Sequence, residues 1–405
     1  MFPQFLKGIR LVDLTWAGAG PFSTKLFSDF GADVIKVESR SRPDPVRVGG
    51  PFRDRVAGIN RSGYFASRNT GKRSLAINLK NQASRETLFA LIREADVISN
   101  NFGPGAMERL GLGDDAVRAV KPDIIYLAMP MYGENGPLAT LTGVGMTISA
   151  VSGLMWQTGY EGGEPIGPGT HFPDHAANPY HAAFAVLAGL RHRRATGRGL
   201  KIDLSQVEST INCMGLPVLD YMATGVERAR HGNRSPFHAP HNIFRCRGAD
   251  EWCAVAVLSN GQWRSLCEVM GAAGLAADPA LATAEGRLAA IDRVEGAVAD
   301  WTAGHDATEV MLRLQAKSVP AGVVASSRFL MEEDAQLAHR AYWQKVDHPE
   351  IGESRFTSLP FLVDGERVAL RRPPLLGEHN EDVLCGILGY TKARVQQLRD
   401  EGVLE

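Results

Sequence analysis

An aspartate stands where the chain passes from a glycine-rich stretch into a predicted helix. Asp174 follows Gly167-Pro168-Gly169 and precedes residues 175–194, which carry Ala and Leu at helical spacing. The positive end of a helix dipole keeps a nearby carboxylate ionised, and an ionised carboxylate can act as a nucleophile. An N-cap aspartate is the common structural alternative, because its side chain accepts hydrogen bonds from the first helical turn. These residues alone leave both roles open.

An incomplete dinucleotide-binding motif lies near the N-terminus. Gly18-Ala19-Gly20-Pro21-Phe22-Ser23 follows a predicted strand, and Glu38 ends the next one, near where a dinucleotide-binding fold places its ribose-binding acid. Ser23 stands where the motif requires glycine or alanine, and Pro21 lacks an N–H donor. The stretch therefore predicts a tight turn that opens a helix toward an anion, whereas NAD binding is disfavoured.

Basic and polar residues follow other predicted strands. The ends of parallel strands form the edge where α/β sheets bind ligands, and Lys and Arg that converge there suit a phosphate-bearing cofactor. The alternative is ordinary solvated surface charge. The residues are Lys72-Arg73-Ser74, Asn78-Leu79-Lys80, and Asn101-Phe102-Gly103-Pro104-Gly105 with Arg109.

The sequence does not favour metal or hydrolase chemistry. His171 and His175 stand four residues apart, but Pro173 interrupts the helix that would align them as zinc ligands. The five cysteines contain no C-x-x-C pair, which disfavours a structural zinc site or a disulfide scaffold. The sequence contains neither G-x-S-x-G nor a P-loop motif, so serine-hydrolase and P-loop chemistry are disfavoured.

The elements that must position these residues alternate between strand and helix. Such alternation indicates a parallel sheet built from βαβ units, so we predict an α/β fold. Strands are expected at 9–14, 32–37, 74–79, 96–99, 124–128, 201–204 and 251–258, and helices at 22–30, 84–94, 175–194, within 261–320, and from about 391.

The pattern also predicts how the chain divides. We expect a large domain at 1–205, a linker at 206–225 and a small α/β domain at 226–325. Residues 326–405 are expected to form a further linker and a C-terminal segment that returns to the large domain.

Composition excludes several other classes. The chain has 405 residues, and 44% of them are hydrophobic, which is enough for a folded core. With 44 Lys and Arg against 45 Asp and Glu, no global charge draws it to nucleic acid or to an anionic membrane. We see no secretory signal and no run of about 18 apolar residues. A reducing cytoplasm is therefore the expected compartment.

Five ordered signatures resemble the family III CoA-transferases over nearly the whole chain. This family includes formyl-CoA transferase, carnitine CoA-transferase and alpha-methylacyl-CoA racemase. The signatures lie at 11–38, 69–80, 101–111, 196–199 and 376–379.

The resemblance implies a fold and a mechanism. The large domain is expected to be Rossmann-like and to bind CoA rather than NAD, without a metal. The assembly is expected to be an interlocked homodimer, or a heterodimer with a related chain. Asp174 occupies the place of the family's catalytic aspartate. It would attack an acyl-CoA thioester to give a mixed anhydride, and the released thiolate would then form an aspartyl-CoA thioester, from which a carboxylic acid acceptor takes the CoA.

The resemblance also implies individual binding residues. Arg109 is expected at the CoA nucleotide, Asn101 and Phe102 on its adenine side, and Asn78 and Lys80 near the ribose and phosphate. The remaining positions are expected at the pantetheine and thioester (Gly18, Ala19), elsewhere on CoA (Ser39, Arg40, Lys72) and in the substrate pocket (Tyr64, Val144, Gly145).

Departures from the relatives bear on the substrate. Formyl-CoA transferase has glutamine where this chain has Gly18, and Lys, Tyr and Glu where it has Thr142, Val144 and Gly145. We therefore expect a roomier, more apolar acyl pocket. The racemase histidine aligns with Val144, so two-base racemisation lacks one base. Intramolecular CoA transfer, acyl-CoA isomerisation, and a CoA-binding subunit without turnover remain as alternatives.

Overall fold

The computed structural model describes residues 2–405, which form two compact units. The large unit comprises the residues up to 156, then 166–227 and 336–405. The small unit comprises 157–165 and 228–335. Among the described helices, none is both long and apolar enough to cross a membrane.

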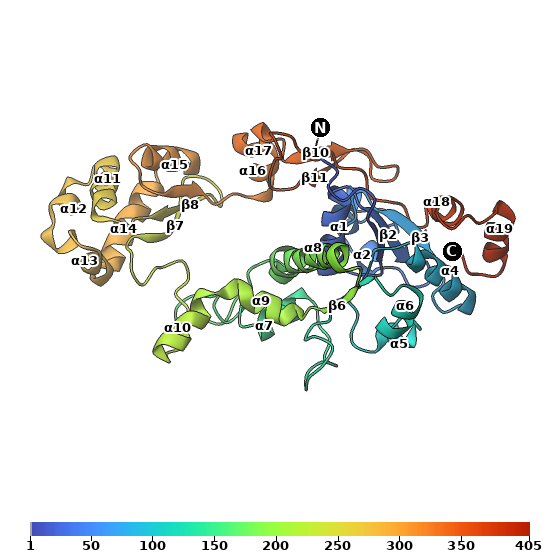
Figure 1. Ribbon diagram of the computed structural model, residues 1–405. Helices are drawn as coiled ribbons and strands as arrows, with labels where there is room; N and C mark the ends of the chain where they lie inside the picture. Colours follow the sequence, from blue (N-terminus) through green and yellow to red (C-terminus); the bar gives the residue numbers. More distant parts are fainter. Residues whose placement is uncertain (1) are drawn as a thin grey trace. The chain divides into compact units, whose positions relative to one another are not determined.

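A six-stranded parallel sheet forms the centre of the large unit (Figure 1). Its order is β3-β2-β1-β4-β5-β6, and every neighbouring pair is parallel. The direction of strand addition reverses between β1 and β4, the point where such sheets bind ligands. This confirms the predicted α/β fold. The strands are β1 (Arg10–Asp13), β2 (Asp33–Glu38), β3 (Arg73–Ala76), β4 (Val97–Asn100), β5 (Ile125–Ala128) and β6 (Leu200–Asp203).

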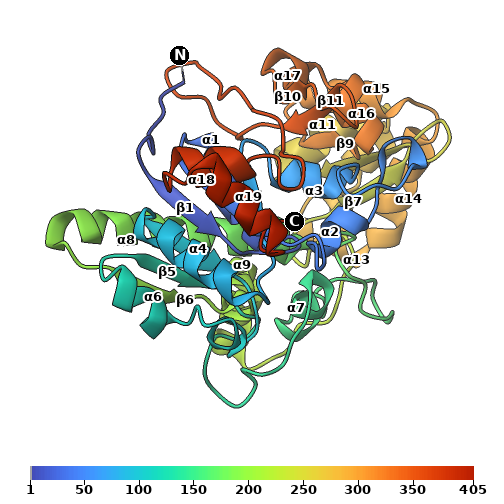
Figure 2. The same cartoon turned by 90° about the vertical axis from the view of Figure 1, so that its right-hand side faces the viewer.

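Helices cover both faces of this sheet, because successive strand residues point to opposite sides. Val12 and Ile98 pack into a core with one group of helices, while Leu11 and Val97 pack into a core with another group. The first group is α4 (Gln82–Arg93), α18 (Asn380–Gly386) and α19 (Lys392–Asp400), seen in front of the strands in Figure 2. The second group is α1 (Ala19–Asp29) and α8 (Asn178–Thr196).

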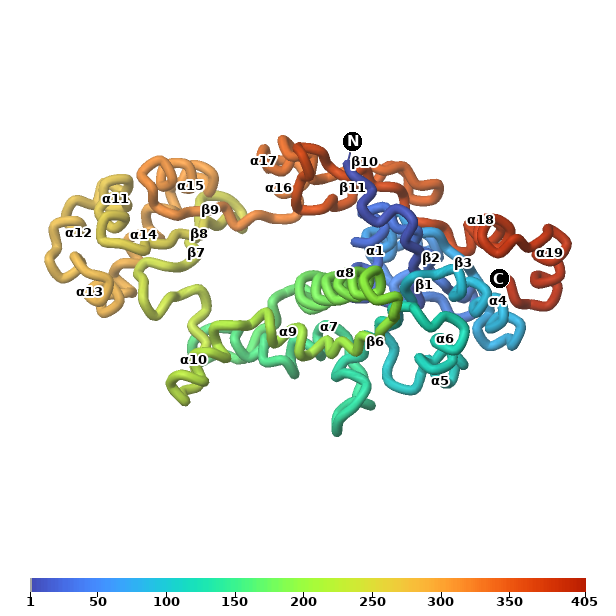
Figure 3. Tube along the Cα trace, viewed as in Figure 1, coloured from blue at the N-terminus to red at the C-terminus, as the bar shows by residue number. Residues whose placement is uncertain are grey.

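The C-terminal segment completes the large unit. Figure 3 shows its red trace beside the blue N-terminal strands. The backbone N–H of Ala76, at the end of β3, donates to the side chain of Asn380 at 2.8 Å, and Ile77 bridges to Leu404. The segment also contains an antiparallel pair, β10 (Trp343–Val346) and β11 (Ser354–Thr357).

Shorter helices connect these elements. The predicted linker at 206–225 forms two of them, α9 and α10. The short helices are α2 (Pro45–Val48), α3 (Gly63–Arg68), α5 (Ala106–Arg109), α6 (Asp114–Val120), α7 (Gly145–Val151), α9 (Gln206–Met214), α10 (Leu216–Thr224) and α17 (Ala335–His339), with a 3-10 turn at Arg53–Arg55.

The small unit contains an antiparallel sheet of order β7-β8-β9 and its own core around the buried Trp263. The predicted helical stretch at 261–320 forms a series of helices there. The elements are β7 (His241–Arg245), β8 (Trp252–Ala256), β9 (Ala321–Val323), α11 (Asn260–Met270), α12 (Ala273–Ala277), α13 (Ala284–Ala289), α14 (Ile291–Thr302), α15 (Ala307–Gln315) and α16 (Ser327–Glu332), with a 3-10 turn at Pro279–Leu281.

Candidate active site

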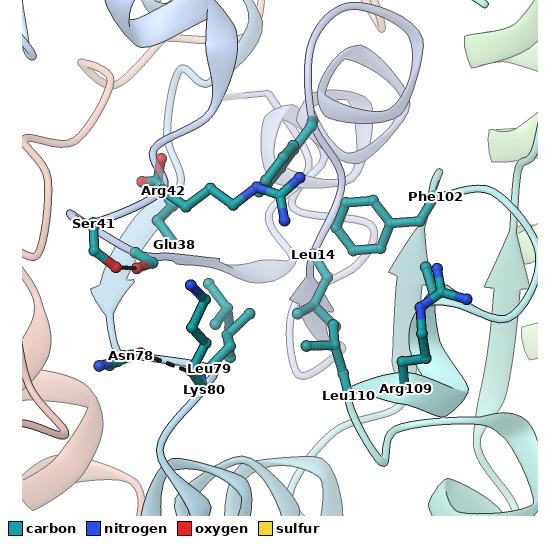
Figure 4. A pocket seen from close by; sticks show the side chains of 14 residues that line it. Leu14, Glu38, Ser41, Arg42, Asn78, Leu79, Lys80, Phe102, Arg109 and Leu110 are labelled. Carbon is teal, nitrogen blue, oxygen red and sulfur yellow. Dashed lines mark hydrogen bonds between the residues drawn. The ribbon is translucent and has the colours of Figure 1, made fainter. Parts of the chain in front are cut away.

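A cavity of about 270 Å³ opens in the large unit at the carboxyl ends of β1 to β4 (Figure 4). The residues that follow each of these strands form its walls. Its lining residues are Leu14, Trp16, Val37, Glu38, Ser39, Ser41, Arg42, Asn78, Leu79, Lys80, Phe102, Ala106, Arg109 and Leu110. We call it the cation-lined cavity, for the reason given next.

Three cations line the cavity wall, namely Arg42, Lys80 and Arg109. In the described chain, no ion pair within 4.0 Å involves Arg42, Lys80 or Arg109. The acid of the wall, Glu38, is already neutralised, because Arg47 donates to its two oxygens at 2.7 and 2.8 Å. The cavity therefore carries an excess of positive charge, which suits a phosphate-bearing ligand.

Two aromatic rings lie beside these cations. Trp16 and Phe102 meet edge to face with 5.3 Å between ring centroids, and the guanidinium of Arg42 lies 5.3 Å from the Trp16 ring. The amide side chain of Asn101 holds the backbone of Trp16. It accepts from the backbone N–H of Trp16 and donates to the backbone C=O of Trp16, both at 2.8 Å. Rings beside cations can hold the flat base of a nucleotide next to its phosphates.

The structure brings some of the predicted CoA-binding residues to this cavity and not others. Those in its wall are Ser39, Asn78, Lys80, Phe102 and Arg109. Those outside the wall are Gly18, Ala19, Arg40, Lys72 and Asn101. Sequence reasoning missed Trp16, Ser41 and Arg42, although their positions just after the first two strands could have indicated them.

Lys72 lies in the protein interior instead of facing the cavity. Its ammonium donates to Asp13, Thr24, Asn69 and the carbonyl of Pro21, at 2.7 to 2.9 Å. Burial lowers the pKa of Lys72 to about 8, although Asp13 opposes this shift. Because its ammonium donates to four protein oxygens, Lys72 stabilises the loop after β1. The structure therefore corrects its placement among the ligand contacts.

The turn after β2 binds the chain's own last residue. The side-chain carboxylate of Glu405 accepts three hydrogen bonds through Oε2. The donors are the Ser39 hydroxyl at 2.7 Å, the backbone N–H of Arg40, and the backbone N–H of Ser41 at 3.4 Å. Arg40 itself is exposed. This turn is thus a set of anion-binding donors at the cavity wall that an internal carboxylate already occupies.

Asp174 does not cap a helix. It lies inside a π-helical turn, Pro173–Ala177, that runs directly into α8. The N-cap positions of the turn and of α8 are Phe172 and Ala177, and neither end has a side-chain capping bond. The N-cap alternative is therefore wrong. Irregular π turns occur frequently at functional sites, because they change the direction of a side chain within a helix.

Two glycines and a tyrosine enclose Asp174. A Cβ added to Gly18 would lie 2.9 Å from Asp174 Cβ and Cγ and 2.9 Å from the Tyr64 hydroxyl, and one added to Gly145 would collide with Asp174 Oδ2. Asp174 and Tyr64 therefore fill the space that a side chain at position 18 would need. Val144, also predicted in the substrate pocket, is 62% exposed.

The loop after β1 links this group to the cation-lined cavity. Trp16 lines the cavity and Gly18 packs against Asp174. Two residues span at most about 7 Å of extended chain. A ligand with a long flexible arm can therefore contact the cavity with one end and Asp174 with the other.

The carboxyl of Asp174 is buried, with 9% of the residue exposed, and in the described chain it forms no ion pair. Burial raises the pKa of Asp174 to about 6, and the neighbouring His171 and Arg68 moderate the shift. Burial, followed by the charge of Arg68, lowers the pKa of His175 to about 4. At neutral pH, His175 is therefore an uncharged ring beside an ionised Asp174.

The described residues contain no group of three or more His, Cys, Asp or Glu arranged to hold a metal ion. In particular, Nδ1 of His175 lies 2.7 Å from Nη2 of Arg68, so this ring nitrogen already has a hydrogen-bond partner within the chain.

Comparison with known proteins gives the family. A model described as CoA-transferase family III matches residues 6–380. The chain is 32% identical to the formyl-CoA:oxalate CoA-transferase of Streptomyces coelicolor over 100% of both chains. It is 30% identical to the succinyl-CoA:glutarate CoA-transferase of Mus musculus, over 99% of this chain and 90% of that one.

Solved structures agree with this placement. A CaiB/BaiF family protein from Brucella suis superposes with a TM-score of 0.86 at 28% identity, covering 95% of this chain and 100% of that chain. A protein from Mycobacterium tuberculosis superposes with a TM-score of 0.78 at 25% identity, covering 94% and 98%. The chain therefore belongs to the CoA-transferase family III, a family of transferases whose substrates are CoA thioesters.

Proposed function

We propose that the protein moves CoA from an acyl-CoA thioester to a carboxylic acid, with Asp174 as the covalent nucleophile. The observation that carries this proposal is the state of Asp174. Its carboxylate is buried, lies against two glycines, and forms no ion pair with any of the described residues. A carboxylate stripped of water and counter-ions is a better nucleophile than a solvated one, and a pKa of about 6 keeps it ionised at neutral pH.

The proposed reaction has four steps. The Asp174 carboxylate attacks the thioester carbonyl, the C–S bond breaks, and a mixed anhydride and a CoA thiolate result. The thiolate attacks the aspartyl carbonyl, which releases the acyl group as a carboxylate and leaves an aspartyl-CoA thioester. The acceptor carboxylate then attacks this thioester, which expels the CoA thiolate and forms a second mixed anhydride. The thiolate finally attacks the acceptor-derived carbonyl of that anhydride, which gives the new acyl-CoA and frees the Asp174 carboxylate. Each step exchanges one acyl bond for another, so no oxidant or metal is consumed.

We place the nucleotide part of CoA in the cation-lined cavity. Arg42, Lys80 and Arg109 supply charge for its phosphates, and Trp16 and Phe102 supply rings for its base. The pantetheine arm would follow the loop past Gly18 to Asp174. No step requires NAD, and Glu38, the candidate ribose acid, is engaged by Arg47.

The decisive test traps the covalent intermediate. The protein is incubated with an acyl-CoA and hydroxylamine, digested, and examined by mass spectrometry. We expect an aspartyl hydroxamate on Asp174, because hydroxylamine cleaves both the anhydride and the aspartyl thioester at an activated carbonyl. Asp174→Asn should give no hydroxamate while still binding CoA. A modification on a different residue, or transfer activity without any hydroxamate, would contradict the role of Asp174.

We also propose that the working form is a dimer of two such chains or of this chain with a related one. Helix α10 supports this, because it exposes a run of large apolar side chains, with Leu216 at 69% and Met222 at 75% exposure and Leu219 and Tyr221 between them. A surface of this kind is typical of an interface. Light scattering and sedimentation at nanomolar concentration should show a dimer. A stable folded monomer at that concentration would contradict it.

The proposed compartment is the cytoplasm. The five cysteines carry free thiols throughout the described chain, which fits a reducing environment. Fractionation of the source cells, with the protein followed by antibody, tests this placement.

A further inference from the structure

Arg68 is a cation beside Asp174 that the proposed reaction does not use. It ends helix α3, which begins after Ser62, whose hydroxyl accepts from the N–H of Phe65 at 3.3 Å. Tyr64 and Arg68 stand four residues apart on this short helix and therefore share a face. Tyr64 lies next to Asp174, so the same face brings Arg68 to the active site.

Among the described residues, no carboxylate forms an ion pair with this guanidinium. Arg68 is half-buried, and in the described chain no carboxylate lies within 4.0 Å of its nitrogens. Its Nη2 meets a ring nitrogen of the neutral His175 at 2.7 Å, and its Nε is buried without an acceptor. The guanidinium carbon lies 4.6 Å from the centroid of the Phe22 ring and 5.5 Å from that of Tyr64.

Arg47 shows what a buried guanidinium of this chain has when it is only structural. It donates to both oxygens of Glu38 and to the side chain of Asn60 at 3.0 Å. Removing a cation from water without such compensation is costly. Burial lowers the pKa of Arg68, although Tyr64 and the charge of Asp174 oppose this shift. Its buried Nε still has no acceptor, and an anion that arrives with the substrate would supply one.

We propose that Arg68 binds a substrate carboxylate other than the one that reacts, so that the preferred acids are dicarboxylic. This inference rests on the proposed function of Asp174. It adds to that function a substrate class, acids with two carboxylates, and a residue that selects them.

The chemistry distinguishes the second carboxylate from the reacting one. The reacting carboxylate loses its negative charge when it becomes an anhydride and then a thioester. A guanidinium that bound it would stabilise the reactant more than the transition state and so slow the reaction. A second carboxylate keeps its charge throughout, so Arg68 can bind it equally in every state. Such uniform binding lowers KM and leaves kcat nearly unchanged.

The test compares acids that differ only in the second carboxylate. The acceptors are straight-chain diacids from oxalate to adipate and the monoacids of matching carbon number, such as succinate against butyrate. Acetyl-CoA serves as donor because its acyl group carries no carboxylate. The protein is wild type, Arg68→Met or Arg68→Lys, and Arg118→Met is the control, because Arg118 pairs with Asp114 on α6 and does not line the site.

In Arg68→Met we expect the KM for the best diacid to rise by roughly ten- to hundredfold, the usual value of a hydrogen bond to a charged group. Because loss of the Arg68 charge also raises the pKa of Asp174, the assays are run at about pH 8, where Asp174 is ionised in both proteins. There kcat should change by the same factor for the diacid and the matched monoacid, while the KM for the monoacid stays within about twofold. Arg68→Lys should recover part of the diacid affinity. Unchanged binding of CoA by calorimetry shows that the variants are folded. Equal losses for diacids and monoacids, or no loss for either, would overturn the proposal.

Failure of the proposed function gives a different result. If the wild-type protein transfers CoA to no acid, the mechanism fails, and a calorimetric titration with succinate then decides the role of Arg68. Binding to wild type that is lost in Arg68→Met supports the carboxylate site. Equal binding to both proteins, or no binding to either, refutes it.

Discussion

Two regions of the large unit each bury a carboxylate, but the two carboxylates differ in their ion pairing and in the direction of their pKa shift. Under the loop after β1, Asp13 is completely buried and accepts from Lys72 at 2.9 Å and from the hydroxyl of Thr24 at 2.7 Å. Burial alone would raise its pKa, but Lys72 and Lys36 outweigh burial, and the pKa of Asp13 lies below its usual value. Asp174 is also buried, yet within residues 2–405 no cation pairs with it, and its pKa rises to about 6.

The same contrast holds for guanidinium groups. Arg47 pairs with Glu38 of the cavity wall, whereas Arg68, near Asp174, contacts rings and a neutral histidine and forms no ion pair in the described chain. Charges that hold the fold together are thus neutralised within the chain. In our proposal, the charges at the site gain their partner only when a ligand binds. Leaving them unpaired lowers the stability of the fold, and the paired region offsets this loss.

The largest expected effect is the loss of CoA-transfer activity when the unpaired carboxylate, Asp174, is replaced. Asp174→Asn should lower the rate of CoA transfer by at least about a thousandfold, because an amide cannot form the anhydride. Steady-state assays with product thioesters measured by mass spectrometry check this. Asp382→Asn, an exposed substitution in the first turn of α18, is the matched control. Near-wild-type turnover by Asp174→Asn would remove the chemical distinction between the two regions.

The second prediction separates the regions by stability. Asp13→Asn should lower the free energy of unfolding by about 3–5 kcal/mol, since it leaves the Lys72 ammonium buried without its counter-ion. Asp174→Asn should instead raise it, by up to about 3 kcal/mol, because it removes a buried unpaired charge.

The size of the stabilisation expected in Asp174→Asn depends on pH. The folded pKa of Asp174 lies above its ordinary value, so wild type loses stability as pH rises from about 4 through about 6, and the gain in Asp174→Asn should be complete only above that range. Urea unfolding followed by circular dichroism at several pH values measures both variants. Equal destabilisation by the two substitutions would mean that Asp174 is a structural charge like Asp13.

The third prediction concerns the pH dependence of transfer. Protonation of Asp174 removes the nucleophile, so kcat/KM should fall about tenfold per pH unit below pH 6 and reach a plateau above it. A pH–rate profile of the wild-type protein, corrected for any loss of folded protein, checks this. Activity that stays level down to about pH 5 would indicate an Asp174 pKa as low as that of a paired carboxylate.

The smallest predicted effect concerns the cation-lined cavity. Arg109→Ala should raise the KM for acyl-CoA by about tenfold with a smaller change in kcat, because it removes a charge-assisted contact far from the reacting bond. Arg118→Ala, which removes an arginine already paired with Asp114 at 2.7 Å, should leave the KM unchanged. An equal effect of the two substitutions would place the nucleotide elsewhere.

Local patterns predicted most of the fold. The strand expected at 124–128 is β5, Ile125–Ala128, and the helix expected at 84–94 is α4, Gln82–Arg93. The helix carries its apolar residues at helical spacing, and the strand is a short continuous apolar run that is buried on both faces, so neighbouring residues are enough to specify them. The irregular turn at Pro173–Ala177 was not predicted, because the extra residue in a π turn leaves no distinct periodicity in the sequence.

Sequence alone determined which residue types stand after each strand, and with them the positions of Lys80, Phe102 and Arg109 at one edge of the sheet. Tertiary structure alone decided that Lys72 is directed inward to Asp13 while Lys80 faces the cavity. It also brought Arg68 beside His175, 107 residues later in the chain. The reason is physical: residue type sets which charges a chain carries, but burial and pairing, which fix their pKa and their use, depend on contacts between residues far apart in sequence.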